Sequence, residues 1–209
     1  MKSAILLSGM LLFSTYTIGQ DLVIPDYKGD KESFTKLKNK TIRKEVATFT
    51  DAGSAENKSN IVLKEIPLSK FGANYSTFEK DSIIVKLTVG KFVKANHKIK
   101  YINQLAVKID NKAIWGTDGE LPKQEINSIY VRIGQDTVQI PKSAYQDLYE
   151  PALSWKEVNK KMGTLSVYYS RDGRRFYIAM ANSDGAGFYE ATFIINDKKY
   201  FGRVLDTGF

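Results

Sequence analysis

The feature that most restricts the fold of this 209-residue chain is an alternation of apolar and polar residues with a period of two. It dominates from Thr41 onward, and its clearest runs are residues 83–89, 99–109, 129–133, 165–169, 176–180 and 189–195. Because successive side chains of a strand point to opposite faces, each run predicts a β-strand with one buried face. The sequence therefore predicts an all-β, mostly antiparallel protein, either a β-sandwich or a partly open barrel, with one or two short helices.

Short polar segments between the runs predict the turns. The sequence Ser170-Arg171-Asp172-Gly173 predicts a tight hairpin with a positive φ at Gly173, and Asp110-Asn111 and Asn196-Asp197 predict two further hairpin turns. Residues 95–97 predict a turn that would join residues 82–94 and 98–110 into one long hairpin.

Two segments depart from the strand pattern. Ser154 and Glu157 have the spacing of a capping box, and Gly163 offers a stop, which together predict a helix of about two turns. Residues 141–149 predict one more helical turn.

The N-terminal residues have the layout of a targeting signal. Lys2 precedes an apolar run over residues 4–13, and Gly19 follows a short polar stretch, which is typical of a signal peptide cleaved before Gln20. The run is about half as long as a membrane span requires. We expect a signal peptide at residues 1–19, a polar leader at 20–40 and a single β-rich domain at 41–209, in a secreted or periplasmic protein.

The chain contains no cysteine and one histidine, His97. These counts exclude thiol catalysis, zinc–thiolate sites and iron–sulfur clusters. Small secreted animal domains usually carry disulfides, so an exported chain without cysteine indicates a bacterial source. A hydrophobic core alone can stabilise a domain of this size.

The positive charge is concentrated in one quarter of the chain. The formal net charge is +8, and residues 61–112 hold ten lysines against four acidic residues. If residues 82–94 and 98–110 pair as a hairpin, one face carries a lysine ridge formed by Lys86, Lys94, Lys98, Lys100 and Lys108. This ridge predicts an anionic partner such as an acidic polysaccharide or lipid headgroups, and a merely solvated sheet face is the alternative. Nucleic acid is disfavoured because arginines and aromatic residues are not interleaved with the lysines.

A second candidate surface combines tyrosine and arginine around the 170–173 turn. Tyr177 is expected on the outer face of its strand, opposite Phe176 and Ile178, and an aromatic and guanidinium surface of this kind suits sugars or a protein partner. The predicted ligand-binding residues are Tyr169, Arg171, Arg174, Tyr177, Asp184 and Tyr189. A partly buried outer sheet face would contain the same tyrosines.

Two glycine-containing loops stand out by composition, at residues 116–120 and 182–190. Each contains an aspartate beside glycine, so calcium is a possible ligand, although no EF-hand spacing is present. The second loop is distantly similar to the Ser-Gly-x-x-Tyr motif of the periplasmic lysozyme inhibitors. Here Asp184 separates Ser183 from Gly185, Gly185 lies four residues before Tyr189 instead of three, and the family's Tyr-x-x-x-Lys-Gly motif is absent.

Three hypotheses for function follow. The first is a non-catalytic exported binding or accessory protein that recognises an anionic glycan or another component of the cell envelope. The second is an inhibitor of an extracellular hydrolase that acts by inserting the 182–190 loop. The third is a glycan hydrolase that uses two carboxylates, drawn from Asp118, Glu120, Asp147, Glu150, Asp172, Asp184 and Glu190.

Overall fold

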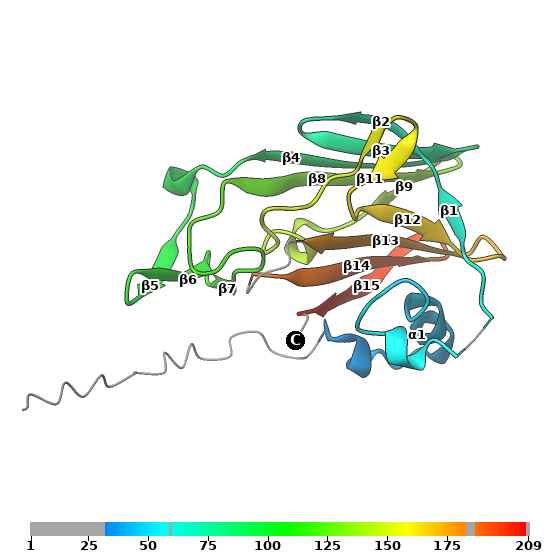
Figure 1. The fold of residues 1–209 in the computed structure, drawn as a ribbon, viewed down its shortest axis with the longest axis horizontal. Helices are drawn as coiled ribbons and strands as arrows, with labels where there is room; N and C mark the ends of the chain where they lie inside the picture. Colours follow the sequence, from blue (N-terminus) through cyan, green and yellow to red (C-terminus); the bar gives the residue numbers. More distant parts are fainter. Residues whose placement is uncertain (1–31, 59, 183–186, 208–209) are drawn as a thin grey trace, which may run out of the picture.

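Figure 1 shows the computed structural model of the chain, which describes residues 32–58, 60–182 and 187–207. The helix and strands are α1 (Lys40–Val46), β1 (Lys64–Ile66), β2 (Leu68–Gly72), β3 (Tyr75–Lys80), β4 (Ile83–Lys91), β5 (Ile99–Ile102), β6 (Leu105–Ile109), β7 (Lys112–Ala113), β8 (Gln124–Ile133), β9 (Asp136–Gln139), β10 (Trp155–Glu157), β11 (Lys160–Met162), β12 (Ser166–Tyr169), β13 (Arg175–Asn182), β14 (Tyr189–Asn196) and β15 (Lys199–Asp206). Short 3-10 turns are η2 (Phe34–Lys36), η3 (Ser54–Glu56), η4 (Lys94–Asn96) and η5 (Lys142–Ala144).

Two five-stranded antiparallel sheets pack face to face (Figure 1). The first sheet has the strand order β1-β12-β13-β14-β15, and the second sheet has the order β2-β3-β4-β8-β9. One apolar core fills the space between them, with Val85 and Val131 from the second sheet and Ile178 and Phe193 from the first. The predicted all-β class is confirmed, and the described strands form a sandwich that does not close into a barrel.

The predicted alternation is confirmed in the second sheet. In β4 the odd residues Val85, Leu87 and Val89 are buried, while Lys86 and Thr88 on the opposite face are only half-buried. The adjacent tyrosines of β12 also point to opposite faces, as expected: Tyr169 packs against the core between the sheets, and Tyr168 packs on the other side.

The predicted turns are largely confirmed. Gly173 has a φ of +71°, and its N–H donates to the Ser170 carbonyl at 2.9 Å. Asp110 and Asn111 have positive φ and join β6 to β7. The turn after β14 lies one residue later than predicted, at Asp197-Lys198, because Asn196 still pairs with Lys199 as the last rung of the β14–β15 ladder.

The long hairpin predicted for residues 82–94 and 98–110 is wrong. β4 pairs with β3 and β8, whereas residues 99–109 form β5 and β6 of a separate sheet, β5-β6-β7, which we call the small sheet. Asn103 and Gln104 take positive φ and reverse the chain between β5 and β6. The second half of the predicted hairpin is thus a hairpin by itself, and it projects from one end of the sandwich (Figure 1).

The helix of about two turns predicted between Ser154 and Gly163 is also wrong, because β10 and β11 form a two-stranded hairpin there. Ser154 cannot cap a helix: its backbone N–H donates to Ser76 Oγ at 3.0 Å and its hydroxyl donates to the Leu165 carbonyl at 2.7 Å. Gly163, the expected stop, takes a φ of +81°, and a Cβ there would collide with the Leu153 carbonyl oxygen. Long-range hydrogen bonds therefore override the local capping signal. The helical turn expected within residues 141–149 is present as η5.

Residues 32–56, which we call the cover segment, lie over the outer face of the first sheet (Figure 1). Phe34 and Val46 pack there against Tyr177 and Ile194, and all four are essentially fully buried. The alternation pattern does not predict α1, which begins where the Asn39 side chain accepts hydrogen bonds from two backbone N–H groups at 3.1 Å. The described part of the polar leader, residues 32–40, therefore contributes Phe34 to a second apolar cluster.

Candidate functional site

The two glycine-containing loops come together in the structure. A Cβ on Gly187 would lie 2.8 Å from both Asp118 Oδ1 and the Thr117 backbone nitrogen, so glycine permits this close contact. The Asn182 side chain and the Tyr189 hydroxyl both donate to the Tyr149 carbonyl, at 2.9 and 3.2 Å. These bonds hold both ends of the second loop against the body of the protein. Residues 183–186, including the predicted site residue Asp184, lie outside the described part of the chain.

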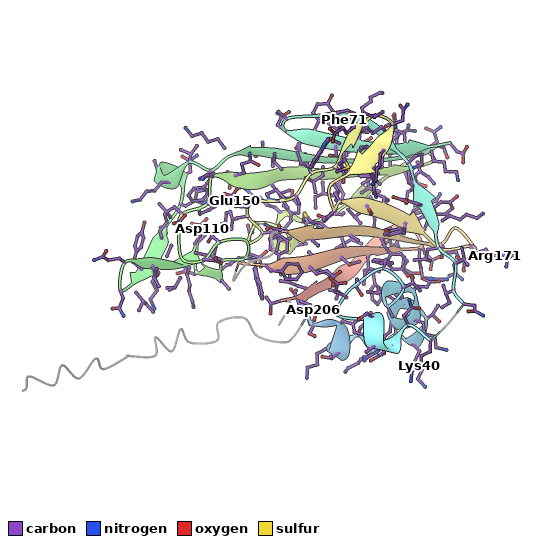
Figure 2. All side chains as sticks on the ribbon, viewed as in Figure 1. Lys40, Phe71, Asp110, Glu150, Arg171 and Asp206 are labelled. Carbon is purple, nitrogen blue, oxygen red and sulfur yellow. The ribbon has the colours of Figure 1, made fainter. Side chains whose placement is uncertain are left out.

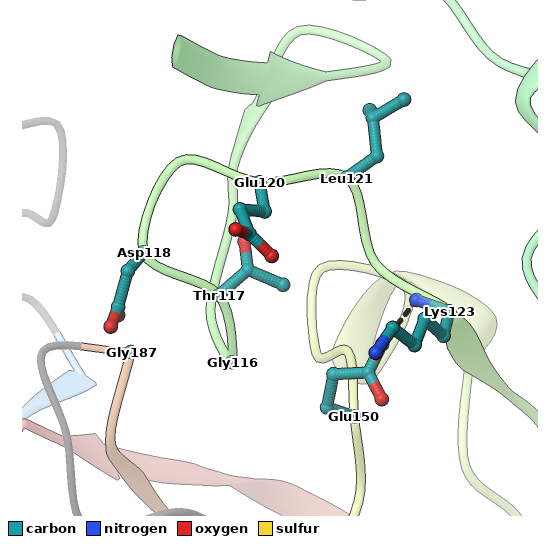
Figure 3. Close-up of a pocket in the computed structure, with 8 residues that line it drawn as sticks. All are labelled: Gly116, Thr117, Asp118, Glu120, Leu121, Lys123, Glu150 and Gly187. Atoms are coloured by element: carbon teal, nitrogen blue, oxygen red, sulfur yellow. Dashed lines mark hydrogen bonds between the residues drawn. The ribbon is translucent and has the colours of Figure 1, made fainter.

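A polar pocket of about 410 Å³, which we call the loop pocket, lies beside this contact (Figure 3). It is lined by Gly116, Thr117, Asp118, Glu120, Leu121, Lys123, Glu150 and Gly187. The Glu150 carboxylate accepts hydrogen bonds from the backbone N–H groups of Lys123 and Gln124, the latter at 3.0 Å. With three carboxylates and one lysine in its lining, the loop pocket is acidic.

The loop pocket gathers three of the acidic residues that the sequence offers as candidate catalytic groups, and the described residues of its lining include no arginine or histidine. Within the described ranges, no group of three histidine or acidic side chains has the arrangement needed to hold a metal ion. The described residues therefore provide no cluster of acidic side chains for the calcium ion that the sequence suggests.

Two of the predicted ligand-binding tyrosines are buried, so their assignment to an exposed surface is wrong. Tyr177 does lie opposite Phe176 and Ile178, but the cover segment packs over it and its hydroxyl donates to Glu45. Tyr189 lies in the core between the sheets. Burial is the main cause that raises the pKa of both phenols above the ordinary value of 10.0, so both remain neutral donors.

The remaining residues of the Tyr/Arg prediction lie near the solvent. Tyr169 is half-buried and stacks on Phe176, while Arg171 is exposed at the β12–β13 turn. Arg174 is exposed and forms an ion pair with Asp197 at 2.6 Å. This end of the molecule therefore keeps two exposed arginines but loses the tyrosine surface that the sequence predicts around them.

The five lysines of the predicted ridge do not share one sheet. Lys86 lies in β4 of the second sheet, whereas Lys94 and Lys98 flank the start of the small sheet, and Lys100 and Lys108 are cross-strand partners within it. Figure 2 shows Asp110 of the β6–β7 turn and Arg171 at opposite ends of the molecule. The small-sheet lysines and the exposed arginines are consequently two separate positive regions.

The outward face of the second sheet brings together aromatic and cationic side chains. One cross-strand row runs through all five strands, with the order Lys70, Thr77, Lys86, Tyr130 and Gln139. Neighbouring rows add Tyr75, Arg132 and Glu79. We call this surface, defined by Lys70, Tyr75, Lys86, Tyr130 and Arg132, the tyrosine–cation face.

The tyrosine–cation face is accessible. The Lys70 side chain is 69% exposed and Tyr130 is 42% exposed. The Lys86 ammonium lies 5.1 Å from the centre of the Tyr75 ring, in the range of a cation–π contact. Glu79 pairs with Lys70 at 3.5 Å, so three cations face one carboxylate on this surface.

Comparisons with known proteins add no assignment. No protein-family model, curated protein or solved structure matches the chain. Over the described residues, no helix is both long enough and apolar enough to cross a membrane.

Of the residues that define the tyrosine–cation face, Lys86 alone was among the predicted site residues. Tyr130 and Arg132 alternate with the buried residues Ile129, Val131 and Ile133, so their outward direction was readable from the same pattern. The hydrolase-inhibitor hypothesis depends on residues 183–186 and stays a prediction.

Proposed function

We propose that this chain is an exported, non-catalytic binding protein that recognises an anionic glycan, or another anionic component of the cell envelope, through the tyrosine–cation face. The observation that carries the proposal is the cross-strand row in which Lys70, Lys86 and Tyr130 lie on the outward face of one sheet. The acidic loop pocket has the wrong charge for such a ligand.

The chemistry of this face matches an acidic sugar. The apolar C–H face of a sugar ring can pack on a tyrosine ring, while a carboxylate or sulfate group pairs with lysine or arginine. The exposed lysines in and beside the small sheet, including Lys94, Lys98 and Lys100, add a positive field that attracts the same ligand from a distance. Lysine gives diffuse attraction, whereas Arg132 supplies the planar group suited to a bidentate contact.

The test is binding of the chain from Gln20 onward, which retains every described residue, to arrays of anionic and neutral glycans at low and high salt. We expect binding to anionic glycans that weakens at high salt. The combined substitutions Lys70→Gln, Lys86→Gln and Arg132→Gln are expected to abolish it. Tyr130→Ala is expected to weaken it by about tenfold at either salt concentration, because the ring contact is not screened.

A matched control separates the face from net charge. Lys38→Gln, Lys40→Gln and Lys44→Gln remove the same charge from exposed positions on the cover segment. Equal losses in the two triple variants, or no glycan binding by the unmodified chain, would contradict the proposal. Lys94→Gln, Lys98→Gln and Lys100→Gln should slow association more than they change dissociation, since these lysines act by steering.

A second candidate function, a carboxylate-dependent glycan hydrolase, is favoured by the gathering of Asp118, Glu120 and Glu150 in the loop pocket. Two carboxyl groups on either side of a glycosidic bond are the groups that such hydrolysis needs. Release of reducing sugar from cell-wall polysaccharide, lost in Asp118→Asn and in Glu120→Gln but kept in the exposed control Asp136→Asn, would support it. Release that survives both pocket substitutions, or none by the unmodified chain, would reject it.

A further inference from the structure

The β10–β11 hairpin presents apolar side chains to solvent. Val158, at its turn, is 95% exposed and Trp155, at its base, is 47% exposed. Trp155 and Phe71 also line a groove of about 610 Å³ between the hairpin and the β2–β3 turn. Figure 2 labels Phe71 on this side of the molecule. The exposed tip and the groove thus adjoin through Trp155.

The turn of the β10–β11 hairpin holds a β-branched residue in a strained backbone conformation. Val158 has a φ of +45° and Asn159 a φ of +68°, the pattern of a two-residue hairpin turn that favours asparagine, aspartate or glycine. Among the described residues with positive φ, Val158 is the one with a branched Cβ. A β-branched residue in this conformation is a genuine outlier, and at 95% exposure no packing within the chain compensates for it.

Positive charge flanks the apolar tip on both strands. Residues 155–162 contain Lys156, Lys160 and Lys161 against Glu157, a net charge of +2. Lys156 and Lys161 are direct cross-strand partners, and Lys161 is drawn towards Glu65 at 2.6 Å. Lys156 and Lys160 are exposed. An anionic surface above the tip would complement these cations.

We propose that the β10–β11 hairpin docks on a bilayer that contains anionic lipids. Val158 enters the boundary between headgroups and acyl chains, Trp155 lies at headgroup level, and Lys156 and Lys160 contact lipid phosphates. A specific protein interface buries roughly 1,200–2,000 Å² in total, more than the tip of a short hairpin offers, so charge and size both favour the bilayer. The inference uses none of the residues of the tyrosine–cation face.

Tryptophan fluorescence provides the direct readout. The chain has two tryptophans, and Trp115 is buried at 8% exposure, so an environment-dependent shift reports Trp155. The chain from Gln20 onward is mixed with vesicles of phosphatidylcholine alone or of equal parts phosphatidylcholine and phosphatidylglycerol. We expect a blue shift and reduced quenching by iodide with the anionic vesicles, and binding about tenfold weaker with the neutral ones.

Val158→Asn tests the tip without endangering the fold, because asparagine accepts a positive φ better than valine. The variant is expected to unfold at the same or a higher temperature and to bind anionic vesicles about tenfold more weakly. Val62→Asn is the matched control, since Val62 is 76% exposed outside any strand. Lys156→Gln combined with Lys160→Gln should weaken binding to anionic vesicles, whereas Lys38→Gln combined with Lys40→Gln should not.

Four results would overturn the inference. The first is no Trp155 shift with anionic vesicles. The second is binding by Val158→Asn equal to that of the unmodified chain. The third is an equal shift with soluble heparin in the absence of lipid, which would make the hairpin a polyanion contact. Vesicle binding lost in the Lys70, Lys86 and Arg132 variant but kept in the hairpin variants would instead assign membrane attraction to the tyrosine–cation face and reject the hairpin.

Discussion

The two sheets of the sandwich differ in what lies on their outer faces. The first sheet is covered by residues 32–56, and its strand β14, which lies between β13 and β15, is buried along nearly its whole length on both faces. The second sheet has one buried face, and its outward side chains are mostly exposed or half-buried. The protein thus uses one sheet to anchor its N-terminal region and leaves the other available for a ligand.

This difference is visible in the strand sequences. A strand with one solvated face alternates, as β4 and β8 do, whereas a strand covered on both faces reads as a continuous apolar run. Residues 176–180 are among the alternating runs because Phe176, Ile178 and Met180 share one face, but every position in residues 176–181 is apolar, and the cover segment packs on the second face. An unbroken apolar strand is therefore evidence for a further layer, even when the layer itself has little strand or helix signal.

The largest expected contrast comes from removing a tyrosine ring on each face. Tyr177→Ala should lower the free energy of unfolding by about 4 kcal/mol, because it leaves a cavity under the cover segment. Tyr130→Ala, on the open face, should change it by less than about 0.5 kcal/mol. Urea unfolding measures both. Similar effects in the two variants would show that the cover segment does not seal the first sheet.

The next effect concerns the buried ion pair between the cover segment and the first sheet. Glu45 pairs with Arg175 at 2.7 Å and accepts a hydrogen bond from Tyr177, and the two charged side chains are 7% and 15% exposed. Glu45→Ala leaves the phenol without its acceptor and leaves the guanidinium with the more exposed Asp172, at 3.1 Å, as its other carboxylate partner, so we expect a loss of about 3 kcal/mol. Glu56→Ala, which removes the acid of an exposed pair with Arg43, is the comparison in thermal unfolding and should have little effect.

A smaller effect is expected in the pH dependence of stability. Burial raises the pKa of Glu190 above its ordinary value of 4.5, although the carboxylate accepts N–H groups from Asp51 and Ala52 of the cover segment, which lower it. The folded state therefore holds this proton more tightly than the unfolded state. Its contribution to stability is largest at acidic pH and is lost as the pH rises from about 4.5 through the raised pKa.

Glu190→Gln removes this titration. The difference in unfolding free energy between the unmodified chain and the variant should fall as the pH rises across that range, as measured by urea unfolding at several pH values. A difference that is constant with pH, or that grows, would contradict the assignment.

The smallest effect is expected at the exposed end of the first sheet. Arg174 adjoins the largely buried side chain of Arg175, which is 15% exposed, but is itself 63% exposed in its pair with Asp197. Arg174→Gln should leave the unfolding temperature unchanged within experimental error, because water screens the pair. A clear drop would show that the β12–β13 turn contributes more to stability than its exposure suggests.

The fold could be predicted from the sequence where local pattern decides the structure. Alternation identified β4, β8 and β12 to β14, because a strand's side chains point alternately to its two faces. Gly173 marked a real turn, because glycine readily adopts the positive φ that the turn requires. The capping box at Ser154 failed because the backbone N–H and hydroxyl of that residue bond to Ser76 and Leu165. A local sequence pattern carries no information about hydrogen-bond partners from distant parts of the chain.

The candidate sites divide in the same way. The meeting of the two glycine loops and the row from Lys70 to Gln139 both depend on which strands become neighbours. β4 pairs with β8 and not with the next strand along the chain, so a face assembled from sequential strands combined the wrong lysines. The outward direction of the Tyr130 side chain could be predicted from the alternation, but its neighbours on the adjacent strands could not.

The pairing of β4 with β8 has an evolutionary consequence. Lys91 and Gln124 are the last paired residues of these two strands, and the Phe92 N–H donates to the Lys123 carbonyl at 2.9 Å. The segment 92–123 therefore leaves the second sheet and returns to it at adjacent positions. An excursion with adjoining ends can be shortened or exchanged without rewiring the sandwich. This excursion carries the small sheet and most of the wall of the loop pocket. The loop pocket thus lies mostly on a segment inserted between two paired strands, whereas the tyrosine–cation face lies on the strands of the second sheet themselves.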